Sequence, residues 1–211
     1  RFLKGLDKSY RAVIRLGETT ATYDTESDIL ERRPVDINRE EIEGALDAFR
    51  GPIMQVPPMY SAIRVEGKRL YELARKGESV EVKPRPVTIE RLEIVAWSPP
   101  DLTLNVRCSS GTYIRSLAHD IGQALGCGGH LRKLTRTANG PFTLSESYTV
   151  DALYRLHQHG RFDEAHLTPS QILRFLPEVT LTDDQAWAVR HGQRLQLEID
   201  ADRPYLRACT K

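Results

Sequence analysis

A tyrosine and an arginine, Tyr113 and Arg115, stand where an alternating strand passes through a glycine turn into a helix. The first N–H groups of a helix have no intrahelical partner, and the helix dipole is positive at that end. The pattern therefore predicts a site for a phosphate or a carboxylate. The more ordinary alternative is a surface arginine beside a strand-to-helix turn.

The elements on both sides of this turn follow clear apolar periods. Apolar side chains alternate with polar ones over residues 102–108, which is typical of a strand with one buried face. After the turn, the helical spacing changes to three and four residues and Gly126 supplies a stop. The apolar residues of this expected helix are Ile114, Leu117, Ala118, Ile121 and Leu125.

Two groups of basic residues are candidates for a nucleic-acid surface. The net charge of the 211 residues is only +1, so a nucleic-acid partner would have to be attracted by such a local patch. The alternative is a solvated helix face or strand edge, where Lys and Arg are normally found. The groups are Arg64, Lys68, Arg69, Arg75 and Lys76, and then Arg132, Lys133 and Arg136.

The composition is that of a globular protein with one sizeable core: 40% of the residues are hydrophobic and 28% are charged. No apolar run is long enough for a membrane span and no signal peptide is visible, so we expect no membrane association and a cytoplasmic location. The three cysteines have no paired spacing, which argues against a disulfide framework and a zinc site. We also expect a monomer.

Strands and helices alternate irregularly along the chain, which predicts the α+β class. Strands are expected over residues 10–16, 29–32, 84–95 and 102–108. Helices are expected after the capping-box pair Asn38 and Glu41, over 68–76 and 114–125, from Thr149 to His157, and after Thr182. The segment 130–136 mixes basic and apolar residues without a clear period.

Residues 58–75 and 111–117 together resemble the TruB family of tRNA pseudouridine synthases. The similarity continues through residues 126–136 and back to 15–24, and both main motifs occur in the family's order and spacing. The resemblance implies a pseudouridine synthase fold, with a mixed, largely antiparallel sheet and flanking helices. It also implies a catalytic domain over residues 1–176 and, over 177–211, part of a small C-terminal PUA-like RNA-binding domain.

The activity implied by the resemblance is the isomerisation of uridine 55 in the T-loop of tRNA to pseudouridine. The C–N glycosidic bond breaks and a C–C bond forms, without a cofactor or a metal. The partner is tRNA, through its T-loop and T-arm. The alternative from another functional class is a non-catalytic module that binds tRNA and assists its folding.

The family's nucleophile is an aspartate in a Gly-x-Leu-Asp-x-x-Ala-x-Gly type motif, which the 211 residues do not contain. Asp7, Asp24 and Asp120 stand in other contexts, so we assign no nucleophile among them. The chain begins with Arg1 rather than Met and enters a strand almost at once, so we expect residues upstream that carry the motif.

The resemblance also assigns roles to residues of this chain. Arg115 is expected to pair with the nucleophilic aspartate, and without that aspartate its charge would be uncompensated. Tyr60 is expected to stack on the flipped base, with Tyr113 near the nucleotide and Leu134 as an apolar wall of the base pocket. Arg64 and Lys68 are expected to contact phosphates.

Overall fold

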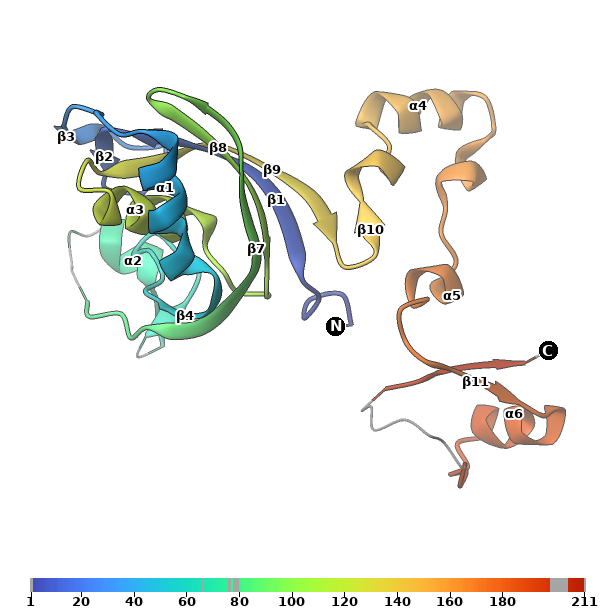
Figure 1. The fold of residues 1–211 in the computed structure, drawn as a ribbon. Helices are drawn as coiled ribbons and strands as arrows, with labels where there is room; N and C mark the ends of the chain where they lie inside the picture. The colour runs from blue at the N-terminus through green and yellow to red at the C-terminus, as the bar shows by residue number, and fades with distance from the viewer. Residues whose placement is uncertain (1, 66, 76, 78–79, 198–204, 211) are drawn as a thin grey trace. The chain divides into compact units, whose positions relative to one another are not determined.

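A curved six-stranded antiparallel sheet organises the first part of the chain. The computed structural model describes residues 2–65, 67–75, 77, 80–197 and 205–210. The strand order is β10-β9-β1-β8-β7-β4 (Figure 1). The strands are β1 (Lys8–Leu16), β4 (Gly51–Gln55), β7 (Arg85–Ser98), β8 (Asp101–Cys108), β9 (Gly129–Asn139) and β10 (Phe142–Thr143).

The apolar alternation of β1 and β8 buries one face of this sheet. Ala12 pairs with Leu104 and Ile14 with Leu102 in antiparallel register, and all four side chains are at most 1% exposed. Directly paired residues point to the same face of a sheet, so these apolar side chains form a continuous surface for helices to cover. The α+β class and the largely antiparallel sheet predicted from the sequence are confirmed.

Two helices, α1 (Arg39–Leu46) and α3 (Ile114–Ala124), cover the buried face (Figure 1). The predicted capping box forms: Glu41 N–H donates to Asn38 Oδ1, and Asn38 N–H donates to the Glu41 carboxylate. Ile42 and Leu46 from α1 join Leu117 and Ile121 from α3 in the same core. The amphipathic patterns read from the sequence therefore correspond to real packing.

Smaller elements lie at the rim of this sheet. The hairpin strands β2 (Glu18–Thr20) and β3 (Ile29–Arg32) follow β1, and β5 (Arg64–Val65) and β6 (Lys68–Arg69) precede the short helix α2 (Leu70–Arg75). The expected helix over 68–76 is thus shorter, because its first residues pair as a strand. Lys76 lies outside the described residues.

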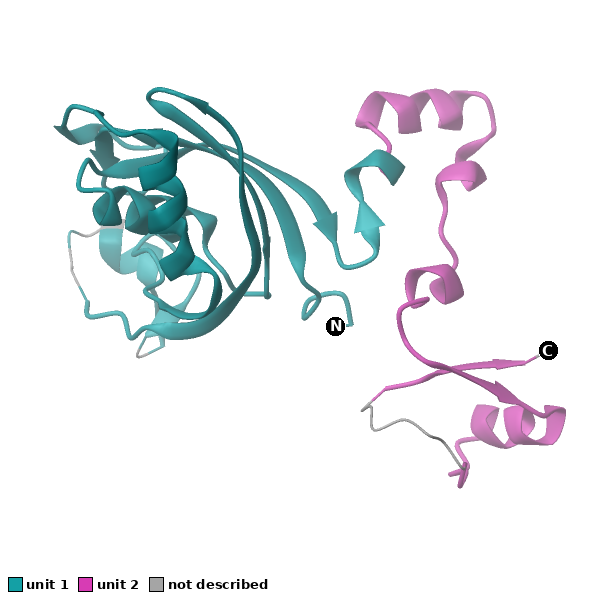
Figure 2. Cartoon of the chain, in the orientation of Figure 1, with its two compact units in different colours: residues 1–146 teal, residues 147–211 magenta. Residues whose placement is uncertain are grey.

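The chain divides into two compact units, residues 1–146 and 147–211 (Figure 2). The second unit contains α4 (Val150–Gln158), α5 (Pro169–Ile172), α6 (Asp183–Arg190) and a parallel pair, β11 (Glu178–Leu181) with β12 (Arg207–Thr210). Thr149 and Thr182 are the N-caps of α4 and α6, as predicted. The domain boundary at residue 176 and the PUA-like character of residues 177–211 stay predictions.

Helix α3 lies very close to the sheet at the start of β9. A Cβ atom on Gly122 of α3 would overlap with backbone atoms of Gly128 and Gly129. Gly128 N–H donates to the Gly122 carbonyl at 2.8 Å. Glycine at position 122 therefore lets β9 run directly beside α3.

We expect Gly122→Ala to lower the free energy of unfolding by about 1–3 kcal/mol or more, because the added methyl group must displace backbone. The matched control is Gly44→Ala in α1, where nothing lies within 4 Å of the added Cβ. That change should be neutral or stabilising by up to about 1 kcal/mol, since Ala is the better helix former. Urea denaturation of both variants measures the difference, and equal stabilities would contradict the close-approach argument.

Candidate functional site

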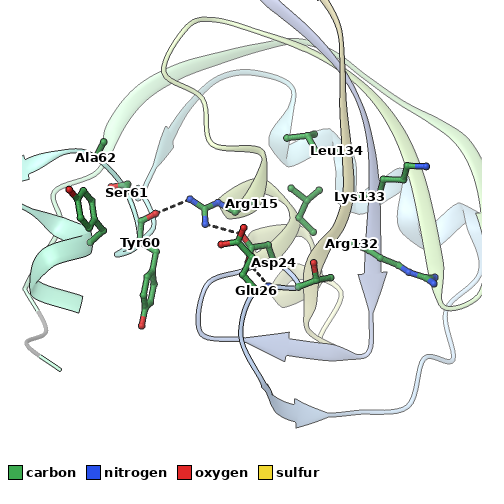
Figure 3. Close-up of a pocket in the computed structure, with 12 residues that line it drawn as sticks. Asp24, Glu26, Tyr60, Ser61, Ala62, Arg115, Arg132, Lys133 and Leu134 are labelled. Atoms are coloured by element: carbon green, nitrogen blue, oxygen red, sulfur yellow. Dashed lines mark hydrogen bonds and ion pairs between the residues drawn. The ribbon is translucent and has the colours of Figure 1, made fainter. Parts of the chain in front are cut away.

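Arg115 lies in the first turn of α3 and connects three segments through its guanidinium group. Nη1 donates to Asp24 Oδ2 at 2.8 Å and to the Thr22 carbonyl at 3.4 Å, and Nη2 donates to the Tyr60 carbonyl at 2.8 Å (Figure 3). The Arg115 and Asp24 side chains are 24% and 15% exposed. The pair is therefore shielded from solvent but still reachable from one side.

The Asp24 carboxylate is held in place by neighbours in its own loop. Thr22 Oγ1 donates to Oδ1 at 2.5 Å and Glu26 N–H donates to the same oxygen at 3.0 Å. Burial alone would raise the pKa of Asp24, but these hydrogen bonds and Arg115 outweigh it, so the pKa lies below its ordinary value. Asp24 is an ionised, oriented carboxylate at neutral pH.

The expectation that the charge of Arg115 is uncompensated without the nucleophilic aspartate is wrong, because Arg115 forms an ion pair with Asp24. In the sequence, Asp24 belongs to the segment 15–24 that resembles the family, and its context excludes it only as the nucleophile. A signal was present: Thr22-x-Asp24-x-Glu26 is a pattern that forms local side-chain-to-backbone hydrogen bonds in turns. Pairing of Arg115 with a second, upstream aspartate stays a prediction.

A cavity of about 680 Å³ opens beside the Arg115–Asp24 pair. Its walls come from the loop after β2, the segment before β5, helices α2 and α3, and strand β9 (Figure 3). Charged, aromatic and apolar groups therefore face a common space, as in sites for polar small molecules or nucleotides. The lining residues are Asp24, Thr25, Glu26, Tyr60, Ser61, Ala62, Tyr71, Arg115, Leu131, Arg132, Lys133 and Leu134.

Three of the residues to which the resemblance assigns roles meet at this cavity, Arg115, Tyr60 and Leu134, together with Arg132 and Lys133 of the second basic group. Tyr60 is half-buried, and Leu134 on β9 is 43% exposed although it is apolar. An apolar side chain that lines a cavity and stays accessible is available to pack against a ligand. These positions are consistent with the predicted roles of Tyr60 and Leu134, which stay predictions.

Tyr113, Arg64 and Lys68 do not line the cavity. Tyr113 is the N-cap of α3, and its backbone is held by the buried Gln55, whose Oε1 accepts from Tyr113 N–H at 2.8 Å. Gln55 Nε2 returns a bond to the Tyr113 carbonyl at 3.1 Å. Arg64 and Lys68 are exposed on the β5–β6 hairpin. A role for them requires a ligand that extends beyond the cavity.

Among the described residues, no group of His, Cys, Asp and Glu side chains could hold a metal ion. In the same part of the chain, no helix is long and apolar enough to span a membrane.

The sequence matches two family models over most of its length. Residues 1–114 match the model described as "TruB family pseudouridylate synthase (N terminal domain)". Residues 115–176 match "tRNA pseudouridylate synthase B C-terminal domain". The junction between the two models falls directly before Arg115.

Curated relatives are similar over nearly all of this chain. "tRNA pseudouridine synthase B" of Stutzerimonas stutzeri is 47% identical over 196 residues, which are 92% of this chain and 64% of that protein. The protein of the same name from Burkholderia lata is 48% identical over 90% of this chain and 59% of its own length. This chain thus spans about three fifths of the length of these two relatives.

Solved structures of similar fold belong to complexes with several components. A chain of the "Cbf5-Nop10-Gar1 Complex" is 28% identical with a TM-score of 0.67, covering 90% of this chain and 50% of that chain. A chain of the "H/ACA RNP bound to a substrate RNA containing 2'-deoxyuridine" is 26% identical with a TM-score of 0.65. The match covers 92% of this chain and 50% of that chain.

We expect Asp24→Asn to lower the free energy of unfolding at pH 7 by about 1–3 kcal/mol, because it removes a charge-assisted hydrogen bond. The folded-state pKa of Asp24 is depressed, so its contribution is complete above the unfolded pKa of about 4 and is lost as pH falls through the folded value. The difference between wild type and variant should therefore shrink toward pH 3.

Denaturation curves between pH 7 and pH 3 measure this difference. Asp28→Asn, an exposed carboxylate in the same loop, is the matched control for loss of a negative charge. If wild type and Asp24→Asn differ in free energy of unfolding by the same amount at pH 7 and at pH 3, Asp24 is not held as an ionised partner of Arg115.

Proposed function

This chain belongs to the TruB family of pseudouridylate synthases, and we propose that its protein converts uridine 55 in the T-loop of tRNA to pseudouridine. The reaction is an isomerisation: the bond between C1′ and N1 breaks, the uracil ring reorients, and C1′ bonds to C5. The proton lost from C5 is balanced by the proton gained at N1, so no cofactor is consumed.

The cavity at the Arg115–Asp24 pair is the observation that carries this proposal. Its volume of about 680 Å³ is ample for a uracil ring and its ribose. A base normally stacked within the T-loop must be flipped out to enter, which costs a few kcal/mol of unstacking. Apolar and aromatic walls at Leu134 and Tyr60 offset part of that cost.

Arg115 has hydrogen-bonding capacity for a second carboxylate. A guanidinium carries five N–H donors, and three hydrogen bonds are recorded for Arg115 in the described part of the chain. The remaining donors support a bidentate or bridging contact with the nucleophilic aspartate that the family motif supplies. Asp24 would then fix Arg115 on one side while Arg115 orients the nucleophile on the other.

Apart from Tyr71, which also lines the cavity, two tyrosines are candidates for stacking on the base. Tyr60 lines the cavity, which supports its assignment from the sequence. Tyr10 on β1 is the second candidate: Ala12, two residues along, pairs with Leu134, so Tyr10 and Leu134 share one face of the sheet. We propose Tyr60 as the stacking residue, with Tyr10 as the residue to test if Tyr60 proves dispensable.

The basic residues around the cavity fit an RNA ligand that is larger than its flipped base. Lys133 lines the cavity, and Arg64 and Lys68 lie on the exposed hairpin that precedes α2. We propose that these residues contact T-arm phosphates, each of which would steepen the salt dependence of binding.

A non-catalytic tRNA-binding or folding module is the second candidate. The family models and the curated relatives carry the name of the synthase, so they do not favour this alternative. Because this chain spans about three fifths of the length of its two relatives described above, activity must be measured on the complete protein.

We expect the complete protein to release tritium from a T-loop stem-loop labelled at C5 of the target uridine. Arg115→Lys should reduce kcat by about 100-fold, because lysine keeps the charge but cannot hold three acceptors in a fixed fork. RNA affinity should change by less than about threefold, since the change acts on the reacting centre.

The matched control is Arg107→Lys, an exposed arginine on β8 that pairs with Asp7 and Glu90 and does not line the cavity. Its turnover should equal that of wild type. Tight RNA binding by the complete wild-type protein without tritium release would reject the synthase and favour the binding module.

A further inference from the structure

The loop that carries Asp24 has an unusual backbone conformation at the preceding residue. Tyr23 has a φ of 62°, and it is the one non-glycine residue with positive φ in the part of the chain that the structure describes. Bulky side chains rarely adopt this conformation, which persists only where the surroundings impose it. The reversal lets the Thr22 carbonyl and the Asp24 carboxylate both reach Arg115.

The Tyr23 ring is itself in contact with α3. It stacks on the imidazole of His119, with ring centroids 4.0 Å apart and an angle of 15° between the planes. His119 is four residues after Arg115, so both side chains lie on one face of α3, one turn apart. Consecutive residues of the loop, 23 and 24, therefore attach to consecutive turns of the same helix.

The imidazole has no hydrogen bond at the nitrogen that faces the protein interior. His119 Nδ1 is buried and has no hydrogen-bond partner among the described residues. Packing against Tyr23 thus orients this ring, rather than a hydrogen bond at Nδ1. On the other side, the Tyr23 carbonyl accepts from Leu131 N–H at 2.9 Å, which ties the same residue to β9.

We propose that Tyr23 and His119 are positioning residues, whose stacked rings fix the register between the Asp24 loop and α3 and so keep Arg115 aligned with Asp24. The inference rests on the proposed function for its catalytic consequence, but the alignment itself is a property of this chain. The competing explanation is ordinary packing, in which the stack supports the fold and has no particular effect on Asp24.

Four variants separate the ring contact from the backbone conformation. Tyr23→Asn removes the ring while retaining a residue that tolerates positive φ, and Tyr23→Phe keeps the ring. His119→Ala removes the stack without touching the loop, and His119→Phe restores an aromatic partner. The two aromatic variants are the matched controls for the two that abolish stacking.

The first readout is the pKa of the Asp24 carboxyl group, measured by carbon NMR on this chain. Arg115, Glu26 and Asp120 are charged groups near Asp24 or Tyr23. The titratable ring of His119 stacks on Tyr23, and Arg132 and Lys133 line the same cavity as Asp24. Burial raises the pKa of Asp120 to about 6, so its titration must be removed by working in an Asp120→Asn background. No RNA and no activity are needed for this measurement.

We expect Tyr23→Asn and His119→Ala to raise the pKa of Asp24 by about half a unit to one unit, as alignment with Arg115 is lost. The aromatic variants should stay at the wild-type value. In the complete protein, kcat for pseudouridine formation should fall by about three- to tenfold in the two stack-breaking variants, with KM nearly unchanged.

An unchanged Asp24 pKa in both folded stack-breaking variants would overturn the proposal. If Tyr23→Asn does not fold, His119→Ala decides, because it leaves the loop intact. Global unfolding of both would assign the stack to stability alone and also reject the proposal. A shifted pKa together with no pseudouridine formation by the complete wild-type protein would instead reject the proposed function and leave the alignment established.

Discussion

The ion pair between Arg115 and Asp24 is the interaction on which the arrangement of the site depends. One guanidinium group binds a carboxylate and two backbone carbonyls, from residues 22, 24 and 60. A charge this shielded is tolerated only when it is paired and hydrogen-bonded, and here the charges of Arg115 and Asp24 compensate each other. The site is consequently organised before any ligand arrives, which is the condition for effective electrostatic catalysis.

The ion pair in turn requires α3 to lie close to β9. Gly122 permits that approach, because any side chain there would meet the backbone at residues 128 and 129. The result is that residues 131–134 of β9 contribute to the lining of the same cavity as Arg115. The backbone of β9 also receives the Asp24 loop, through Leu131 N–H and the Tyr23 carbonyl. Packing and chemistry are therefore set by the same contact between helix and strand.

Local signals in the sequence predicted the elements with clear periods, such as β8, α3 and the capped helix α1. Strand β9 was not predicted, because two register shifts interrupt its pairing with β1 and several of its side chains are exposed and basic. Resemblance to a family identified Arg115, Tyr60 and Leu134, which the fold brings to one cavity. Asp24 was missed as a partner because it lies in a loop without periodicity, 91 residues from Arg115.

The most direct measurement of the central claim is a crystal structure of the complete protein bound to a T-loop stem-loop with 5-fluorouridine at the target position. The account predicts that the flipped base occupies the cavity, with Leu134 against it and Arg115 still bound to Asp24. If Tyr10 rather than Tyr60 packs against the uracil ring, only the assignment of the stacking residue changes. A base bound outside this cavity, or an Arg115 detached from Asp24 in the complex, would contradict the account.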